Sequence, residues 1–246
     1  MATGETITSI AGFVKLVESR FREAYGKDHG KKTVLYRGHG ASSFKLCPNV
    51  GRLDPPPDST KKIVNEPLML ELFRRQSTDR IAIGDADDWE LLAIAQHHGL
   101  ATRMLDWTRN PLVALFFAVR TECETRFPDG RPMFEPAEVI AWHCGKINLA
   151  KKRPKGGPLG FEGEDPIRYV PRIVTSRLRA QSGVFTVHRY PKQIFEPKGL
   201  FRITIPWGCR KDLKASLFRL GIHEGVLFPD LDGLARHIQW CQTKSY

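Results

Sequence analysis

The chain has 246 residues, of which 41% are hydrophobic and 26% are charged. This balance is typical of a globular protein that buries its own core, and it excludes a disordered or fibrous chain. Lys and Arg number 38 against 27 Asp and Glu, which gives a net charge of +11. Such a surface favours phosphate-bearing partners, namely nucleic acid, nucleotides or acidic lipid headgroups.

Neither a membrane protein nor a secreted, disulfide-bonded protein is expected. No stretch reaches the roughly 20 apolar residues of a membrane span, and residues 1–10 lack the apolar segment of a signal peptide. The five cysteines are scattered without a CxxC pair, which argues against a disulfide framework and a cysteine zinc site. We therefore expect a cytoplasmic protein with reduced thiols and no membrane partner.

The N-terminal third begins with a helix. Apolar residues recur at helical spacing over residues 10–21, and Ser9 can cap them. Residues 33–36 predict a short buried strand that runs into Arg37-Gly38-His39-Gly40, where two glycines predict a sharp turn just past the strand end. Asn65 can cap the next helix.

The middle of the chain carries its densest polar segment. A helix over residues 89–96 ends near Gly99, and Asn110 with Pro111 opens another. Strands are expected over residues 137–144, 183–188 and 201–207, with helices over 211–220 and 231–241. The Gly- and Pro-rich segment 145–166 predicts a mobile surface loop.

These elements predict an α+β fold with a central mixed or antiparallel sheet flanked by helices. We expect one compact domain. It comprises an N-terminal helix within residues 1–32 and the main body over residues 33–241.

Polar side chains crowd among apolar ones between residues 96 and 110. The polar set is Gln96, His97, Thr102, Arg103, Asp106 and Thr108. Polar groups held so close to core residues need partners or a ligand. Arg103 and Asp106 could equally pair with each other. The tandem histidines lack an HExxH or HxxEH context, so no metal is expected.

Arg37 is a further candidate for a binding residue, outside this polar segment. An Arg just after a buried strand suits two-point contact with a phosphate or carboxylate. The alternative is a structural ion pair with Asp106, Glu66 or Glu71. Both interpretations remain open from the sequence.

The same residues carry a family resemblance. Leu35-Tyr36-Arg37-Gly38, residues 89–100 and residues 102–118 resemble the FRG domain, which is named for a Phe-Arg-Gly motif. Residues 177–185 and 227–234 also resemble it, so the likeness extends over about residues 33–237. Tyr36 departs from the family's Phe.

The motif order is in turn similar to that of ADP-ribosyltransferases. That likeness implies an Arg at the end of a first strand, matched by Arg37, and a Ser or Thr before a helix, matched by Thr108. Gln181 stands in a Gln-x-Glu-like third motif, but Gly183 occupies the position of the Glu. The missing carboxylate would have to come from Asp106, Glu66 or Glu71.

The resemblance implies an enzyme that cleaves NAD as a substrate and modifies a macromolecule, with nucleic acid as one acceptor. Arg37, Asp106, Thr108 and Gln181 would act on the reacting centre. The residues expected to hold NAD are Arg37, Gly38, His39, Gln96, His97, Thr102, Arg103 and Thr108. A role in phage–host or toxin conflict, with an antitoxin or immunity partner, would follow; the oligomeric state stays open.

Two other functions compete. One is a non-catalytic module that binds nucleic acid or a nucleotide through the same site and the basic segment 168–189. The other is a nuclease or phosphotransferase with His97 or His98 as its base. Because buried polar residues need shared partners, we expect Arg37, Gln96, Arg103, Asp106, Thr108 and Gln181 to line one cleft.

Overall fold

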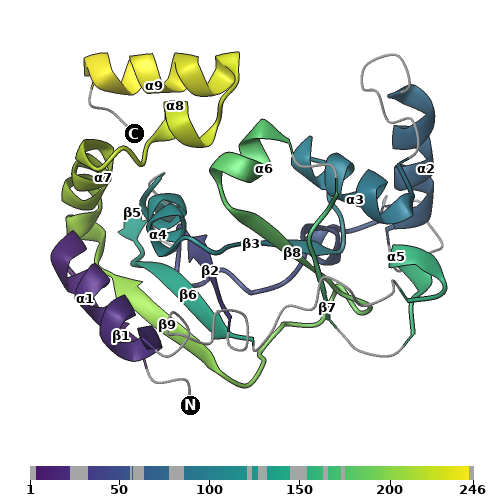
Figure 1. Ribbon diagram of the computed structural model, residues 1–246, viewed down its shortest axis with the longest axis horizontal. Helices are drawn as coiled ribbons and strands as arrows, with labels where there is room; N and C mark the ends of the chain where they lie inside the picture. Colours follow the sequence, from purple (N-terminus) through teal and green to yellow (C-terminus); the bar gives the residue numbers. More distant parts are fainter. Residues whose placement is uncertain are drawn as a thin grey trace.

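The structure is a computed structural model that describes residues 4–22, 33–55, 57, 64–77, 86–120, 124–126, 132–144, 154–162, 166–172 and 175–243. Its centre is a seven-stranded sheet in the order β1-β9-β6-β2-β3-β8-β7 (Figure 1). The strands are β1 (Gly4–Thr6), β2 (Val34–His39), β3 (Met104–Thr108), β6 (Ala137–His143), β7 (Ile167–Tyr169), β8 (Gly183–Val187) and β9 (Leu200–Ile205).

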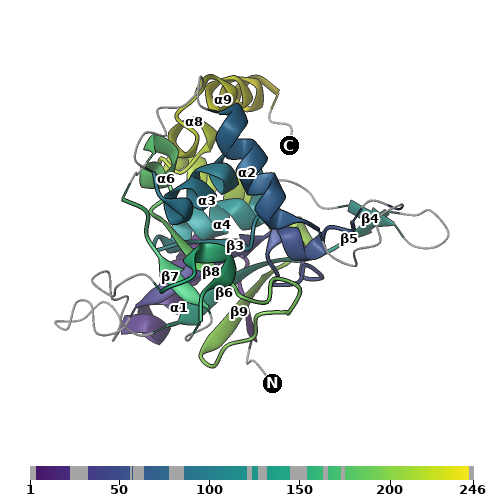
Figure 2. The same ribbon diagram turned by 90° about the vertical axis from the view of Figure 1, so that its right-hand side faces the viewer.

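Neighbouring strands of this sheet are antiparallel, except that β1 and β9 are parallel. The sheet therefore confirms the predicted α+β fold with a mixed, mainly antiparallel sheet. Strands β4 (Glu124–Arg126) and β5 (Pro132–Phe134) pair separately, in a hairpin that projects from the body of the molecule (Figure 2).

Helices surround the sheet, and several begin where the sequence predicts. They are α1 (Ile10–Phe21), α2 (Glu66–Gln76), α3 (Asp88–His97), α4 (Pro111–Val119), α5 (Gly157–Gly160), α6 (Ser176–Ala180), α7 (Arg210–Arg219), α8 (Glu224–Leu227) and α9 (Leu231–Thr243). The side chains of Ser9, Asn65 and Asn110 accept backbone N–H bonds in the first turns of α1, α2 and α4. These bonds satisfy donors that a helix start leaves without partners.

Three apolar clusters hold the layers together. The largest joins α1, α4 and α7 to β2, β6 and β9, with Phe13, Phe116 and Ile203 fully or almost fully buried. A second packs α3 against β7 and β8. A third lies on the other sheet face and includes Trp107 and Trp142, whose ring centroids are 5.6 Å apart. The central sheet, which carries the candidate site described below, is therefore covered by apolar clusters on both faces.

The predicted turn is wrong at Gly38, and the chain bends only from Gly40, just after the end of β2. Strand β2 continues through Arg37-Gly38-His39, and all three pair with β6. Gly38 serves a close approach instead. A Cβ atom on Gly38 would lie 2.1 Å from the Ala114 carbonyl oxygen and 2.5 Å from the Ala118 nitrogen. Helix α4 therefore sits directly on the backbone of β2.

The predicted mobile loop 145–166 is described only in part. Its described residues include α5, and the adjacent Phe161 is 2% exposed and packs beside Trp89 with ring centroids 6.0 Å apart. This part packs against the second apolar cluster, so it is not a simple surface loop. Residues 145–153 and 163–165 lie outside the described residues.

Candidate functional site

A cleft borders the place where strands β2 and β3 diverge. β2 pairs with β6 at six positions and β3 pairs with β8 at five, but β2 and β3 pair at only one, Tyr36 with Thr108. The cleft beside them has a volume of about 270 Å³. It is lined by Tyr36, Arg37, Gly38, Asn49, Gln96, His97, Asp106, Trp107, Thr108, Phe117, Arg177, Leu178, Gln181 and Phe185.

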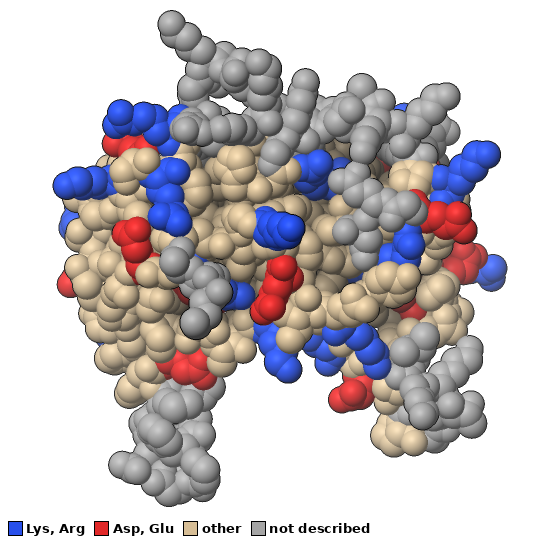
Figure 3. Space-filling view, turned by 90° about the horizontal axis from the view of Figure 1, so that it is seen from below, with Lys and Arg blue, Asp and Glu red and all other residues tan. Residues whose placement is uncertain are grey.

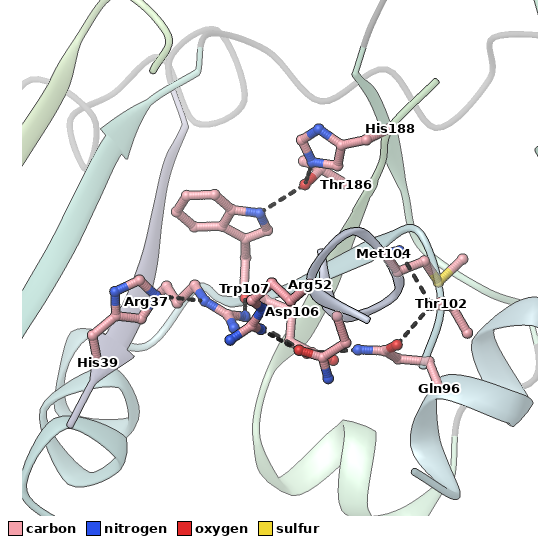
Figure 4. Close-up of polar contacts among 11 residues, drawn as sticks. Arg37, His39, Arg52, Gln96, Thr102, Met104, Asp106, Trp107, Thr186 and His188 are labelled. Carbon is pink, nitrogen blue, oxygen red and sulfur yellow. Dashed lines mark hydrogen bonds and ion pairs between the residues drawn. The ribbon is translucent and has the colours of Figure 1, made fainter. Parts of the chain in front are cut away.

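Arg37 bridges the diverging strands (Figure 4). Its Nη1 donates to the Asp106 carbonyl oxygen at 2.7 Å and lies 3.6 Å from Asp106 Oδ2, while its Nε donates to His39 Nε2 at 3.1 Å. Burial lowers the pKa of the Arg37 guanidinium, and the Asp106 carboxylate opposes that shift. An Arg side chain stays protonated in proteins, so the group is a cation. Arg37 therefore both joins two strands and places a cation at the cleft.

Asp106 is held by a short chain of hydrogen bonds. Gln96 Nε2 donates to Asp106 Oδ2 at 2.9 Å, and the Thr102 hydroxyl donates to Gln96 Oε1 at 2.6 Å. The Met104 N–H in turn donates to Thr102 Oγ1 at 3.1 Å. The chain fixes which end of the Gln96 amide faces the carboxylate. Thr102, which is fully buried, supports the site from behind and does not line the cleft.

Thr108 and Gln181 meet although 73 residues separate them. The Thr108 hydroxyl donates to the Gln181 carbonyl oxygen at 2.6 Å and accepts from the Asn110 N–H at 3.0 Å. The Gln181 side chain donates through Nε2 to the Leu227 carbonyl oxygen at 3.0 Å. These bonds join the start of α4 to α6 and α8, so both residues already have structural roles.

The sequence suggests three carboxylates for the site, namely Asp106, Glu66 and Glu71, and they lie in different surroundings. Glu66 is buried and bound to Arg103, and Glu71 pairs with Arg75 on the exposed side of α2. Among the described residues, Asp106 is the one acidic side chain that lines the cleft. Its side chain is 57% exposed, so it is accessible to a ligand.

Arg103 does not belong to the cleft, which corrects the prediction that it lines the site with Asp106. Its Nε and Nη2 each lie 2.8 Å from Glu66 Oε2, and its Nη1 donates to the Leu159 carbonyl oxygen at 3.1 Å. Glu66 Oε1 also accepts the Arg103 backbone N–H at 2.8 Å. The pair is buried and connects α2, β3 and α5. Asp106, which is close to Arg103 in the sequence, does not pair with it because the Asp106 side chain points into the cleft.

Arg177 is a cleft residue that the sequence did not single out. It projects from α6, and in the described part of the chain it has no hydrogen-bond or ion-pair partner; its guanidinium lies 4.5 Å from the centre of the Phe228 ring. Burial lowers its pKa, and Arg120 adds to that effect. Asp106 and Asp230 oppose this shift, but neither makes an ion pair with Arg177 among the described residues. A partly buried cation without such a direct partner favours an anionic ligand. Its signals in the sequence were its place in the basic segment 168–189 and at the start of residues 177–185, which resemble the FRG domain.

His97 lines the cleft, whereas His98 is exposed and does not. Burial, and then the neighbouring Arg177, lower the pKa of His97. Neutral His97 can accept a proton or a hydrogen bond at neutral pH. His39, predicted to contact a cofactor, lies instead behind Arg37; it is 5% exposed and faces Glu138 at 3.4 Å.

We expect the protein to lose stability in mild acid through His39. Burial lowers the pKa of His39 in the folded state, so below about pH 6.5 the unfolded chain binds a proton that the folded chain resists. As the pH is lowered through this range, the free energy of unfolding should decrease by up to about 1.4 kcal/mol per pH unit for this proton. Urea unfolding between pH 7.5 and 5.5 measures it.

His39→Gln is the matched variant. A Gln can accept from Arg37 and donate to Glu138 but does not titrate in this range. Its pH dependence should be flatter than that of the wild type. Equal slopes for the two proteins would show that His39 does not carry the effect.

Most of the residues that line this cleft come from three segments. These are Tyr36-Arg37-Gly38, the end of the helix at Gln96, and the stretch from β3 into α4. Residues 32–126 match the FRG domain. The FRG match supports the expected family and includes Arg37, Gln96, Asp106 and Thr108. Arg177 and Gln181 lie outside it, so the cleft combines the FRG match with later parts of the chain.

No curated protein and no solved structure matches the chain. Within the described ranges, no helix is long and apolar enough to cross a membrane. The same residues contain no group of three or more His, Cys, Asp or Glu that could hold a metal ion.

Proposed function

We propose that the cleft binds NAD as a substrate, breaks its nicotinamide–ribose bond and transfers the ADP-ribosyl group to a macromolecule. One observation carries this proposal. The three segments that resemble ADP-ribosyltransferase motifs lie on β2, β3 and the turn before β8, which are consecutive strands of the sheet. Arg37, Thr108 and Gln181 from these segments line the same cleft.

The chemistry requires a carboxylate, and Asp106 is the candidate. Breaking the bond to nicotinamide builds positive charge on the ribose, and a fixed negative group stabilises that charge. Gln96 and Arg37 hold the Asp106 carboxylate in place before a ligand arrives. Such preorganisation avoids the cost of orienting the group during the reaction.

The cationic side chains suit the diphosphate of the same substrate. Arg177 makes no ion pair or hydrogen bond among the described residues, and Arg37 keeps donors beyond those used for Asp106 and His39. Arg favours phosphate because its planar group donates two parallel hydrogen bonds. The cleft volume of about 270 Å³ lies just below the usual range of roughly 300–1,000 Å³ for small-molecule sites. It suits one half of a dinucleotide, with the remainder at the surface.

The competing proposal is a module that binds nucleic acid without catalysis. That function needs a continuous basic face with exposed aromatic side chains. On the face shown in Figure 3, Lys and Arg are separated by uncharged surface and by Asp and Glu. This face therefore gives the module no support.

Asp106→Asn should reduce nicotinamide release from NAD by about 100-fold or more, because it removes the charge that stabilises the transition state. The assay uses NAD alone and with RNA, DNA or cell lysate as acceptor. Asp212→Asn, an exposed change on α7 outside the cleft, is the matched control and should retain full activity.

Equal rates for Asp106→Asn and the wild type would exclude Asp106 as the required carboxylate. If the folded wild type releases no nicotinamide with any acceptor, the enzyme proposal fails. Binding of RNA or DNA by the same protein would then favour the module.

A further inference from the structure

His97 lines the cleft, but the proposed reaction does not yet use it. It is the last residue of α3 and directly follows Gln96, whose amide binds the Asp106 carboxylate at 2.9 Å. Its ring meets that of His98 edge to face, with centroids 4.9 Å apart. Neither ring nitrogen of His97 has a hydrogen-bond partner in the described part of the chain. Both nitrogens are therefore available to a ligand.

The surroundings of His97 favour the neutral form of its imidazole. Burial lowers its pKa, and then Arg177 on α6 and the adjacent His98 act in the same direction. Asp230, just before α9, and Asp106 on β3 oppose them. Because the ordinary pKa of His is about 6.5, the ring is mainly neutral at pH 7. A neutral imidazole has one nitrogen that can accept a proton.

The proposed transfer produces a proton when the acceptor is a hydroxyl group. The hydroxyl oxygen forms a bond to C1′ of the ribose, and the bond from C1′ to the nicotinamide nitrogen breaks. The electron pair of that bond leaves with nicotinamide, which becomes neutral. The proton of the hydroxyl group must then pass to a base. An anionic acceptor such as a carboxylate carries no such proton and needs no base.

Two side chains of the cleft are able to act as this base, and one of them already has another task. Among the described lining residues, Asp106 and His97 are the groups that can accept a proton near neutral pH. The Asp106 carboxylate is held by Gln96 and Arg37, and its charge stabilises the ribose in the transition state. A carboxylate that accepted the proton would lose that charge, whereas His97 has none to lose.

We propose that His97 is the general base of this transfer and that the acceptor is an aliphatic hydroxyl group. The inference rests on the proposed function of the cleft. One imidazole nitrogen takes the proton as the acceptor oxygen bonds to C1′, and the imidazolium afterwards releases the proton to water. A positioned general base contributes about 10²–10⁴-fold in rate. A carboxylate acceptor would gain nothing from it.

Two small nucleophiles, used in place of the macromolecule, test the proposal. Methanol carries a proton that must be removed, whereas azide is an anion and carries none. His97→Gln keeps a side chain that forms hydrogen bonds but does not take up the proton. It should lower the transfer of ADP-ribose to methanol by about 100-fold or more, and transfer to azide far less. His98→Gln, the same change in the exposed neighbour outside the cleft, should lower neither.

The pH dependence supplies a readout that a purely structural role would not change. Below the pKa of His97, wild-type transfer to methanol should fall by about 10-fold per pH unit, because only the neutral imidazole accepts the proton. Transfer to azide should not follow this decline, and the decline should disappear in His97→Gln. Added imidazole should restore transfer to methanol in that variant.

The outcomes separate this inference from the proposed function. If the wild type releases no nicotinamide with water, methanol or azide, the proposed function fails and the role of His97 fails with it. If the wild type transfers to both nucleophiles and His97→Gln matches it with methanol, His97 is not the base, while the enzyme proposal stands. Equal losses with methanol and azide would show that His97 positions the site and would overturn its role as the base.

Discussion

Gly38→Ala is expected to lower the free energy of unfolding by about 3 kcal/mol or more, and to abolish the native fold if the total stability is modest. The added Cβ atom would lie 2.1 Å and 2.5 Å from backbone atoms of α4. Backbone in the middle of a packed helix cannot move aside as a side chain can, so α4 must shift from the sheet. The shift would also open the cleft at Thr108.

Gly208→Ala provides the matched control. A Cβ atom at Gly208 would meet no atom within 4 Å, and its backbone does not have a positive φ. Its effect should stay within about 0.5 kcal/mol. Urea unfolding of both variants makes the comparison, and equal stabilities would show that α4 accommodates the extra carbon at Gly38.

Glu66→Ala is the second change with a large expected effect, about 3–5 kcal/mol of lost stability. Among the described residues, the buried Arg103 guanidinium would then keep only its hydrogen bond to the Leu159 carbonyl oxygen. The Arg103 backbone N–H would lose its acceptor. Glu71→Ala, on the same helix, removes an exposed ion pair and should cost at most about 1 kcal/mol.

A double variant distinguishes an unpaired charge from lost packing. Glu66→Gln combined with Arg103→Met retains an acceptor for the backbone N–H and removes both charges. It should recover much of the stability that Glu66→Ala loses, because a buried ion pair contributes little beyond a well-packed neutral pair. Equal losses in the single and double variants would mean that shape, not charge, matters at this position.

Local signals predicted much of the fold. The Asn110-Pro111 pair located the start of α4, and alternating apolar residues located β9, because caps and periodicity depend on near neighbours in the chain. The error at Gly38 has a different origin. A glycine required by a helix on another layer looks the same in the sequence as one required by a turn.

The lining of the cleft was predicted in part, again from residues that are near neighbours in the chain. Asp106, Gln96 and Thr108 were found because they lie close together in the sequence and among apolar residues. Arg103 was assigned wrongly, since its partner Glu66 lies 37 residues away, and no local pattern shows which of two carboxylates it meets. Arg177 escaped notice because its importance depends on its place in the cleft without a direct ion pair among the described residues, which only the three-dimensional arrangement reveals.

The parallel pairing of β1 with β9 has a consequence for protein synthesis. Gly4 pairs with Arg202, so the first strand leaves the ribosome long before its partner exists. At about 5–20 residues per second the nascent chain waits for roughly ten seconds or more with that strand unpaired. Strand β6 also lacks its β9 neighbour during this interval, and exposed strand edges attract other chains. A chaperone that holds the nascent chain until β9 emerges would therefore protect the protein most.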